Sequence, residues 1–251
     1  MPHVKMNGVE LYYEECGDGE PLVLLHHGLS CTKSFSRQVA EFSNHFRVVA
    51  CDRYGYGRST HMTILRENWL EENVAELLGL LDQLGIERTH LCGVCVGGTI
   101  ALLFAAQNPE RAGRIAVAGT CCYNEESITS AVLKFYPPPE DLPPDWVEEL
   151  TSCHGENYAR ELYGIFYRAI REENGYPFKG YDLRQTLSSV KSPVIVIHGD
   201  GDGLFGVEQA LAMHKHLRGS ELYVVPDCGH LPNEEKPEDF NREVLRFLLR
   251  L

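Results

Sequence analysis

One cysteine of this chain lies in a sequence context that is typical of a catalytic nucleophile. Residues 93–98 read Gly-Val-Cys-Val-Gly-Gly, after a strand-like run and before a helix of small residues. This is the G-x-S-x-G nucleophile-elbow pattern, with Cys95 in the place of serine. The turn holds the side chain at the positive end of the helix. Because that helix end and a neighbouring histidine both lower the pKa of a thiol, the pattern predicts attack by a Cys95 thiolate.

A nucleophile of this kind needs a base, and the base needs an acid that orients it. Asp202 follows the strand expected over residues 194–198, and His230 follows the last expected strand. Loops at the carboxyl ends of parallel strands converge on one crevice, so we expect Cys95, Asp202 and His230 to meet there. The chain order nucleophile, acid, histidine is the order associated with this elbow. Asp200 is an alternative acid at this point.

Other interpretations of these residues stay open. Cys95 fits a small buried thiol under a glycine-rich turn, and His230 fits a hydrogen-bonded loop histidine. The pair Cys92 and Cys95 also matches the C-x-x-C spacing of thiol redox proteins. Cys92 falls inside the expected strand, however, whereas a redox dithiol places its first cysteine at an exposed helix start.

The elements that must position these residues alternate along the chain. A hairpin is predicted around Asn7-Gly8, and apolar runs predict strands that are buried on both faces. Helical spacing of apolar residues separates them. The pattern predicts a mostly parallel sheet with helices on both faces. The expected strands cover residues 21–26, 47–52, 89–92, 115–118, 193–198 and 222–225, and the expected helices cover 34–46, 68–85, 99–106, 207–217 and 237–249.

The alternation stops over residues 120–190, which contain proline-rich turns and amphipathic stretches. We expect a helical cap here, inserted into a core built from residues 1–119 and 191–251. Its aromatic side chains would shape a pocket for an apolar or aromatic group, with about half of them packed in the cap itself: Phe135, Tyr136, Trp146, Tyr158, Tyr163, Phe166 and Tyr167. Four cysteines occupy loops that would surround the crevice, either as lining or as small residues in tight loops: Cys31, Cys121, Cys122 and Cys228.

Composition narrows the class of protein. A chain of 251 residues can form one large α/β domain, and a net charge of −13 argues against nucleic acid and anionic membranes as partners. No apolar run reaches the roughly eighteen residues of a membrane span, and no signal-peptide core is present, so the expected compartment is the cytoplasm. The nine cysteines are then expected to be reduced. The cysteine and histidine spacings predict no metal site, and the oligomeric state stays open.

Five segments in the same order resemble the α/β-hydrolase fold superfamily over nearly the whole chain. They are residues 27–29, 52–59, 93–98, 199–202 and 229–230. The resemblance selects Asp202, three residues after the glycine, as the acid. It also implies that the backbone N–H groups of Leu29 and Val96 form the oxyanion hole, which His27 and Gly28 shape. From their places in the expected cap and in a loop beside the crevice, Tyr136, Trp146 and Cys121 are expected near the substrate. No cofactor is required.

The cysteine departs from the serine that most relatives use. A cysteine elbow resembles the dienelactone-hydrolase branch, whereas the other segments look more like general esterases and C–C hydrolases. The resemblance implies hydrolysis of an ester, lactone or thioester of a small molecule through an acyl-enzyme on Cys95. An acyltransferase, a non-catalytic small-molecule receptor and a thiol-redox protein are the alternatives. The sequence leaves open whether Cys95 is native or an engineered replacement for serine.

Overall fold

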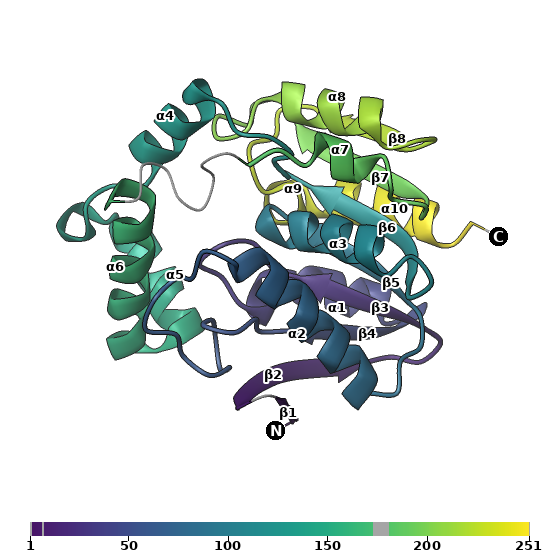
Figure 1. Cartoon of the computed structure of the whole chain (residues 1–251), viewed down its shortest axis with the longest axis horizontal. Helices are drawn as coiled ribbons and strands as arrows, with labels where there is room; N and C mark the ends of the chain where they lie inside the picture. The colour runs from purple at the N-terminus through teal and green to yellow at the C-terminus, as the bar shows by residue number, and fades with distance from the viewer. Residues whose placement is uncertain (1, 7, 173–180, 251) are drawn as a thin grey trace.

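An eight-stranded sheet runs through the centre of the protein, as Figure 1 shows for the computed structural model. The structure describes residues 2–6, 8–172 and 181–250, so Asn7 of the expected turn lies outside the described residues. The strand order is β1-β2-β4-β3-β5-β6-β7-β8, with β2 antiparallel to both neighbours and every other pair parallel. The predicted α/β class is confirmed. The strands are β1 (His3–Met6), β2 (Val9–Cys16), β3 (Glu20–Leu25), β4 (Phe46–Cys51), β5 (Thr89–Val94), β6 (Ala112–Ala118), β7 (Val194–Gly199) and β8 (Glu221–Val225).

The two faces of the sheet are covered by different helices. Side chains alternate along a strand, so Val23 and Leu25 of β3 belong to one core cluster while Leu22 and Leu24 belong to another. The first cluster joins α2 (Trp69–Gln83), α3 (Val96–Gln107), α7 (Arg184–Leu187) and α8 (Val207–His216). The second joins η1 (Thr32–Phe35), α1 (Ser36–Phe42) and α10 (Pro237–Leu248). Both faces of the central strands are therefore buried under helices, which explains their continuous apolar sequence.

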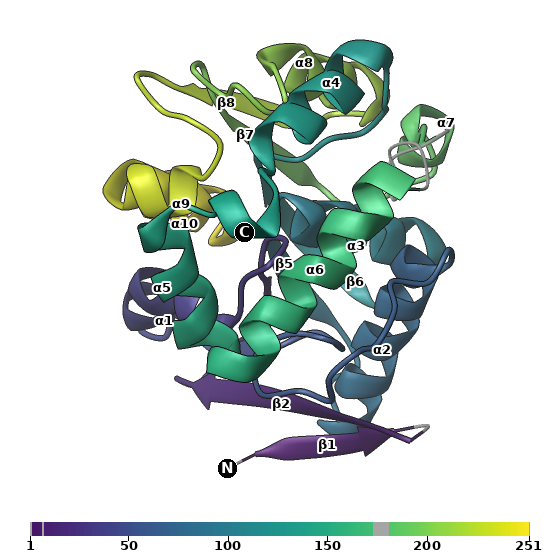
Figure 2. The same ribbon diagram turned by 90° about the vertical axis from the view of Figure 1, so that its left-hand side faces the viewer.

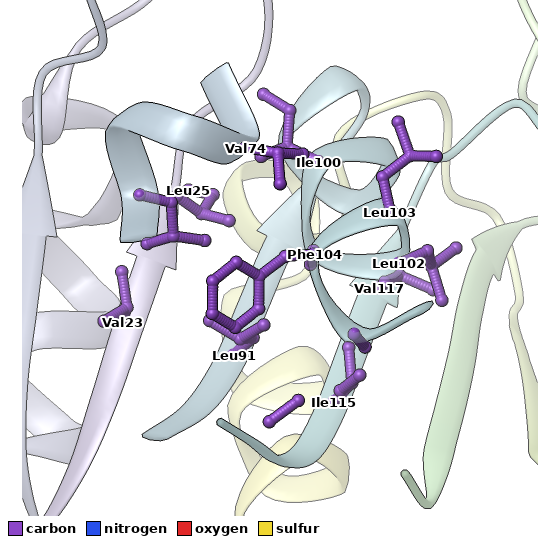
Figure 3. Packing of buried hydrophobic residues seen from close by; sticks show 14 of the residues in the cluster. Val23, Leu25, Val74, Leu91, Ile100, Leu102, Leu103, Phe104, Ile115 and Val117 are labelled. Carbon is purple, nitrogen blue, oxygen red and sulfur yellow. The ribbon is translucent and has the colours of Figure 1, made fainter. Parts of the chain in front are cut away.

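The helix after the elbow is the most deeply buried helix of this core. Helix α3 packs on β5 and β6, and Figure 3 shows Phe104 lying against Leu91 and beside Ile115. Nine of its twelve residues are buried, including Phe104, which has no exposed surface. This packing fixes the helix, and with it the position of the residue just before its start.

A helical insertion, residues 120–190, connects β6 to β7. It contains α4 (Glu126–Phe135), η2 (Pro139–Asp141), α5 (Pro144–His154), α6 (Glu156–Glu172) and the short α7. Figures 1 and 2 show α4, α5 and α6 beyond the ends of the strands, with α6 crossing in front of β5 and α3 in Figure 2. A third apolar cluster joins them to core loops through Leu29, Tyr56 and Phe205.

The helix expected over residues 34–46 is shorter than predicted. A 3₁₀ turn at Thr32–Phe35 leads into α1, which ends at Phe42. The side-chain amide of Asn44 donates to the carbonyl oxygens of Ala40 and Glu41, at 3.4 and 3.0 Å, and so adds hydrogen bonds at the C-terminal end of the helix. Phe46 then begins β4.

The core contribution of α3 can be measured directly. We expect Phe104→Ala to lower the free energy of unfolding by about 3–5 kcal/mol, because it removes a fully buried ring and leaves a cavity. Urea denaturation followed by circular dichroism measures the change. Leu211→Ala is the control, since Leu211 is 52% exposed and its truncation should stay within about 0.5 kcal/mol. Equal effects of the two substitutions would contradict this account of the core.

Candidate active site

Cys95 lies at the turn between β5 and α3 in a backbone conformation that side chains rarely adopt. Its φ is 53° and its ψ is −120°, and strain of this kind is typically stored at functional sites. Its N–H donates to the Ala118 carbonyl oxygen at 2.8 Å. A Cβ at Gly93 would collide with Gly97, and a Cβ at Gly97 would collide with the Leu25 carbonyl oxygen. The glycines of the elbow are therefore required by the close approach of three backbone segments.

The surroundings of the Cys95 thiol favour the thiolate. Burial acts to raise its pKa, but the positive charge and hydrogen bond of His230 outweigh burial and lower the pKa below its usual value. The charge of His27 and the backbone N–H of Val96 act in the same direction. The thiolate is the nucleophilic form of cysteine, so these contacts prepare Cys95 for attack on an electrophile.

His230 contacts the predicted acid through its other ring nitrogen. Its Nδ1 lies 2.9 Å from Asp202 Oδ2, and both side chains are largely buried. Burial acts to lower the histidine pKa, but the Cys95 charge and the hydrogen bond to Asp202 raise it to about 10. This pKa favours the charged form of the ring, whose positive charge in turn lowers the pKa of Cys95. Asp202 stabilises the same charged form.

Asp202 is held from four directions. Its Oδ1 accepts the backbone N–H groups of Leu204 and Phe205, each at 2.9 Å, and its Oδ2 lies 3.2 Å from His198 Nε2 as well as near His230. Burial acts to raise its pKa, but the hydrogen bonds from the two histidines hold the pKa well below its usual range. Asp200, the alternative acid, is exposed and accepts from the Cys228 N–H at 3.3 Å instead.

The loop after β3 carries the expected oxyanion donor and depends on the helical insertion. Leu29 has a φ of 58°, and its carbonyl oxygen accepts from His154 Nε2 at 3.0 Å. The other nitrogen of His154 accepts the Gly57 N–H at 2.8 Å. Burial lowers the pKa of His154, in agreement with a neutral ring that donates on one side and accepts on the other. A residue of α5 thus fixes the backbone of two core loops.

His27 is a charged neighbour of the nucleophile. Its Nδ1 lies 2.9 Å from the Gly28 carbonyl oxygen, and its Nε2 lies 3.1 Å from Glu234 Oε1. Both partners can only accept, so both ring nitrogens carry protons. Burial acts to lower the pKa, but Glu234 raises it above its usual value, which agrees with this assignment.

One group among the described residues has the spacing of metal ligands. The nearest ligand atoms of His27, Glu149 and Glu234 lie within 4.8 Å of one another. A histidine that donates from both nitrogens has no free electron pair for a metal ion. As arranged, these three side chains do not form a ligand set.

A pocket of about 180 Å³ opens beside Cys95. It brings together most of the predicted site residues from the core and from the insertion. Asp202 lies behind His230, outside the lining. Val96 and Cys121 line smaller cavities that also reach Cys95, of about 30 and 20 Å³. The pocket is lined by His27, Gly28, Leu29, Cys95, Phe135, Tyr136, Trp146, Glu149, Leu150, His230 and Leu231.

Some aromatic residues of the insertion are structural. The Tyr158 hydroxyl donates to the Gly55 carbonyl oxygen at 2.8 Å, and the Tyr163 hydroxyl donates to the Pro137 carbonyl oxygen at 2.7 Å. Neither side chain lines the pocket beside Cys95.

For three of the four loop cysteines, the structure agrees with the alternative of small residues in tight loops and not with pocket lining. Cys31 faces Cys153 of α5, Cys122 contacts Gln209, and Cys228 packs in the core under the sheet. None of these three lines the pocket, because their loops turn the small thiol side chains inward.

Cys92 does not fit a redox role with Cys95. It has no exposed surface, and burial raises its pKa to about 12.

Four polar residues at or next to the site were not predicted from the sequence: His154, His198, Glu149 and Glu234. His198 ends the expected strand before the acid loop, and Glu234 follows His230 by four residues, so position along the chain could have indicated both. His154 and Glu149 lie on α5, and no local motif connects them to the core.

Comparison with known proteins agrees with the fold. A model of the alpha/beta hydrolase family matches residues 22–243. The chain is 29% identical to a 2-hydroxy-6-oxononadienedioate/2-hydroxy-6-oxononatrienedioate hydrolase of Burkholderia vietnamiensis, covering 99% of this chain and 94% of the relative. It is 28% identical to the human serine hydrolase BPHL, covering 98% and 85% of the two chains.

Among solved structures, the enol-lactonase of Burkholderia xenovorans LB400 superposes with a TM-score of 0.80 at 25% identity, over 99% of this chain and 100% of that one. None of the helices formed by the described residues combines the length and the apolar character needed to span a bilayer. The family model covers most of the chain, and the sheet order and the turn before α3 agree with it. The chain belongs to the alpha/beta hydrolase family.

Proposed function

We propose that the protein hydrolyses an ester, lactone or thioester of a small molecule through an acyl-enzyme on Cys95. The observation that carries the proposal is that Cys95 and His230 line the same pocket and that His230 contacts the buried Asp202 at 2.9 Å. The lowered pKa of Cys95 and the raised pKa of His230 support an ion pair between them. This is the arrangement of a nucleophile, a base and an orienting acid.

The first step forms the acyl-enzyme. The Cys95 thiolate attacks the carbonyl carbon, and the carbonyl oxygen gains negative charge. The Val96 N–H, which already points at the sulfur, and the Leu29 N–H, for which the described residues supply no acceptor, are the donors proposed to stabilise that oxygen. Protonated His230 gives its proton to the leaving alkoxide or thiolate, so a thioester to Cys95 remains.

The second step releases the product. His230, now neutral, takes a proton from a water molecule as that water attacks the thioester carbon. The carbon–sulfur bond breaks, the acid leaves, and the Cys95 thiolate is restored beside the His230 imidazolium. Asp202 keeps the ring oriented throughout and stabilises its charged form.

The pocket supports a small substrate with an apolar or aromatic part. Its volume of about 180 Å³ is below the usual range for drug-sized ligands. The rings of Phe135, Tyr136 and Trp146 line the pocket together with Cys95. We propose that the helical insertion acts as the cap that selects the substrate. The relatives support the reaction class, since they are named as hydrolases of dienoates and as an enol-lactonase.

One prediction of the proposed function concerns the identity of the nucleophile. Mixing the protein with p-nitrophenyl acyl esters should add the mass of one acyl group, and Cys95→Ala should abolish both this adduct and turnover, by several orders of magnitude. Intact-protein mass spectrometry and p-nitrophenolate release measure the two effects. Cys16→Ala is the matched control, because Cys16 is exposed at the end of β2. An adduct that persists in Cys95→Ala would refute the proposed nucleophile.

The second prediction concerns pH. Because the pKa of Cys95 is lowered, its alkylation by iodoacetamide should persist to lower pH than that of an ordinary thiol, whose pKa is about 8.5. In His230→Ala the pKa should rise, so alkylation at pH 7 should slow by more than about tenfold. Peptide-level mass spectrometry follows Cys95, with exposed Cys16 as the internal control. Identical pH profiles in both proteins would rule out the ion pair.

A further inference from the structure

We propose that the pocket selects a substrate with a positively charged organic group, such as a quaternary ammonium, and that Glu149 recognises this group. The inference rests on the proposed hydrolase function and names its substrate class. Glu149 lies on α5 and lines the pocket that Cys95 and His230 also line.

The charges around the pocket leave an excess of negative charge. His230 is paired with Cys95 and Asp202, and His27 is paired with Glu234. Among the described residues, Glu149 has no hydrogen bond or ion pair of its own, and no lysine or arginine lines the pocket. The charged His27 lies within 4.8 Å of the Glu149 carboxylate, but its Nε2 is hydrogen-bonded to Glu234, so Glu149 has no ion pair of its own within the described part of the chain.

The pKa of Glu149 agrees with this imbalance. Burial raises the pKa above its usual value. The charge of His27 acts against burial, and the charges of Glu234 and Asp145 add smaller increases. A cation bound in the pocket would stabilise the ionised carboxylate. A metal ion is disfavoured because both nitrogens of His27 already donate.

Three aromatic rings complete the proposed cation site. The ring centroid of Phe135 lies 5.0 Å from that of Tyr136 and 5.1 Å from that of Trp146, and the Tyr136 and Trp146 centroids are 6.0 Å apart. All three rings line the pocket with Glu149. Aromatic faces attract organic cations, and quaternary ammonium groups are often bound by several rings together.

The negative charge of Glu149 would repel the anionic substrates after which some relatives are named. The Burkholderia vietnamiensis relative is named for dienedioates and trienedioates, which carry two carboxylates. A second carboxylate in the present pocket would meet Glu149, and no lysine or arginine among the described residues lines that pocket. This chain therefore differs from that relative in the charge of the substrate that it accepts.

Esters of equal shape and different charge test the proposal. In the acyl half, p-nitrophenyl 4-(trimethylammonio)butyrate is compared with the neutral 5,5-dimethylhexanoate ester and the anionic glutarate monoester. In the leaving group, acetylthiocholine is compared with 3,3-dimethylbutyl thioacetate. We expect kcat/KM for the cationic member of at least one pair to exceed that of the neutral member by about tenfold, and the anionic ester to be poorest.

Two variants distinguish the effect of the Glu149 carboxylate from the effect of negative charge elsewhere on the same helix. Glu149→Gln should reduce the ratio of cationic to neutral kcat/KM to near one, whereas Glu148→Gln, an exposed neighbour outside the pocket, should leave the ratio unchanged. Hydrolysis of all esters without a charge preference would overturn this inference and leave the proposed function standing. Failure to hydrolyse any ester, with no Cys95 adduct, would overturn the proposed function instead.

An independent observation carries a second inference. The Sγ atoms of Cys31, in the loop after β3, and Cys153, on α5, lie 2.8 Å apart, and the Cys31 thiol donates to Cys153. This hydrogen bond and the nearby Lys33 lower the pKa of Cys153, whereas the pKa of Cys31 is raised. The geometry points to a disulfide that forms reversibly between the core and the helical insertion.

The chemistry needs a small disulfide as the oxidant. The Cys153 thiolate attacks one sulfur of that disulfide, forms a mixed disulfide and releases one small thiolate. Cys31 then loses its proton and attacks the Cys153 sulfur, which releases the second small thiol and closes the protein disulfide. Two protein thiols are oxidised, and one small disulfide is reduced to two thiols.

Oxidised glutathione is the probe for this reaction. Peptide mapping of the treated full-length protein should show residues 31 and 153 joined, and thermal unfolding should shift upward by several degrees until dithiothreitol is added. Cys31→Ser and Cys153→Ser should each lose the link and the shift. A stable mixed disulfide at Cys153, or links between other cysteines only, would overturn this inference.

Discussion

The carboxylate of Asp202 has no exposed side-chain surface, and both of its oxygens have hydrogen-bonding partners. Two backbone N–H groups and two histidines satisfy its oxygens. A charge buried in this way is stable only while all these partners stay in place. The loop after β7 and the loop after β8 are therefore joined at this point, and His230 reaches Cys95 in a fixed orientation. The proposed ion pair at the nucleophile depends on this contact.

The nucleophile is fixed by steric constraint as well as by charge. Gly97 leaves no space for a side chain against the end of β3, and α3 is buried along most of its length. Cys95 consequently keeps a positive φ that its side chain does not favour. Burial of apolar side chains between the sheet and its helices stabilises the fold and so keeps this strained residue at the pocket wall.

The predictable features of this protein are those encoded locally. Apolar runs and helical spacing indicate the sheet and its helices, and the glycines around Cys95 mark the turn between β5 and α3. The roles of Asp202 and His230 follow from chain order and family resemblance. His154, Glu149 and the contact between Cys31 and Cys153 are not predictable in this way, because they depend on how α5 docks against loops far away in the sequence.

His154 connects the helical insertion to the core of the protein. It belongs to the helical insertion, yet its ring holds the Leu29 carbonyl and the Gly57 amide of the core. The insertion is consequently not an interchangeable module. A segment transplanted from another family member would need a residue with the same pair of hydrogen bonds, or the loop beside the nucleophile would lose its support. Diversification of the pocket in this lineage is therefore coupled to the geometry of the loop that carries Leu29.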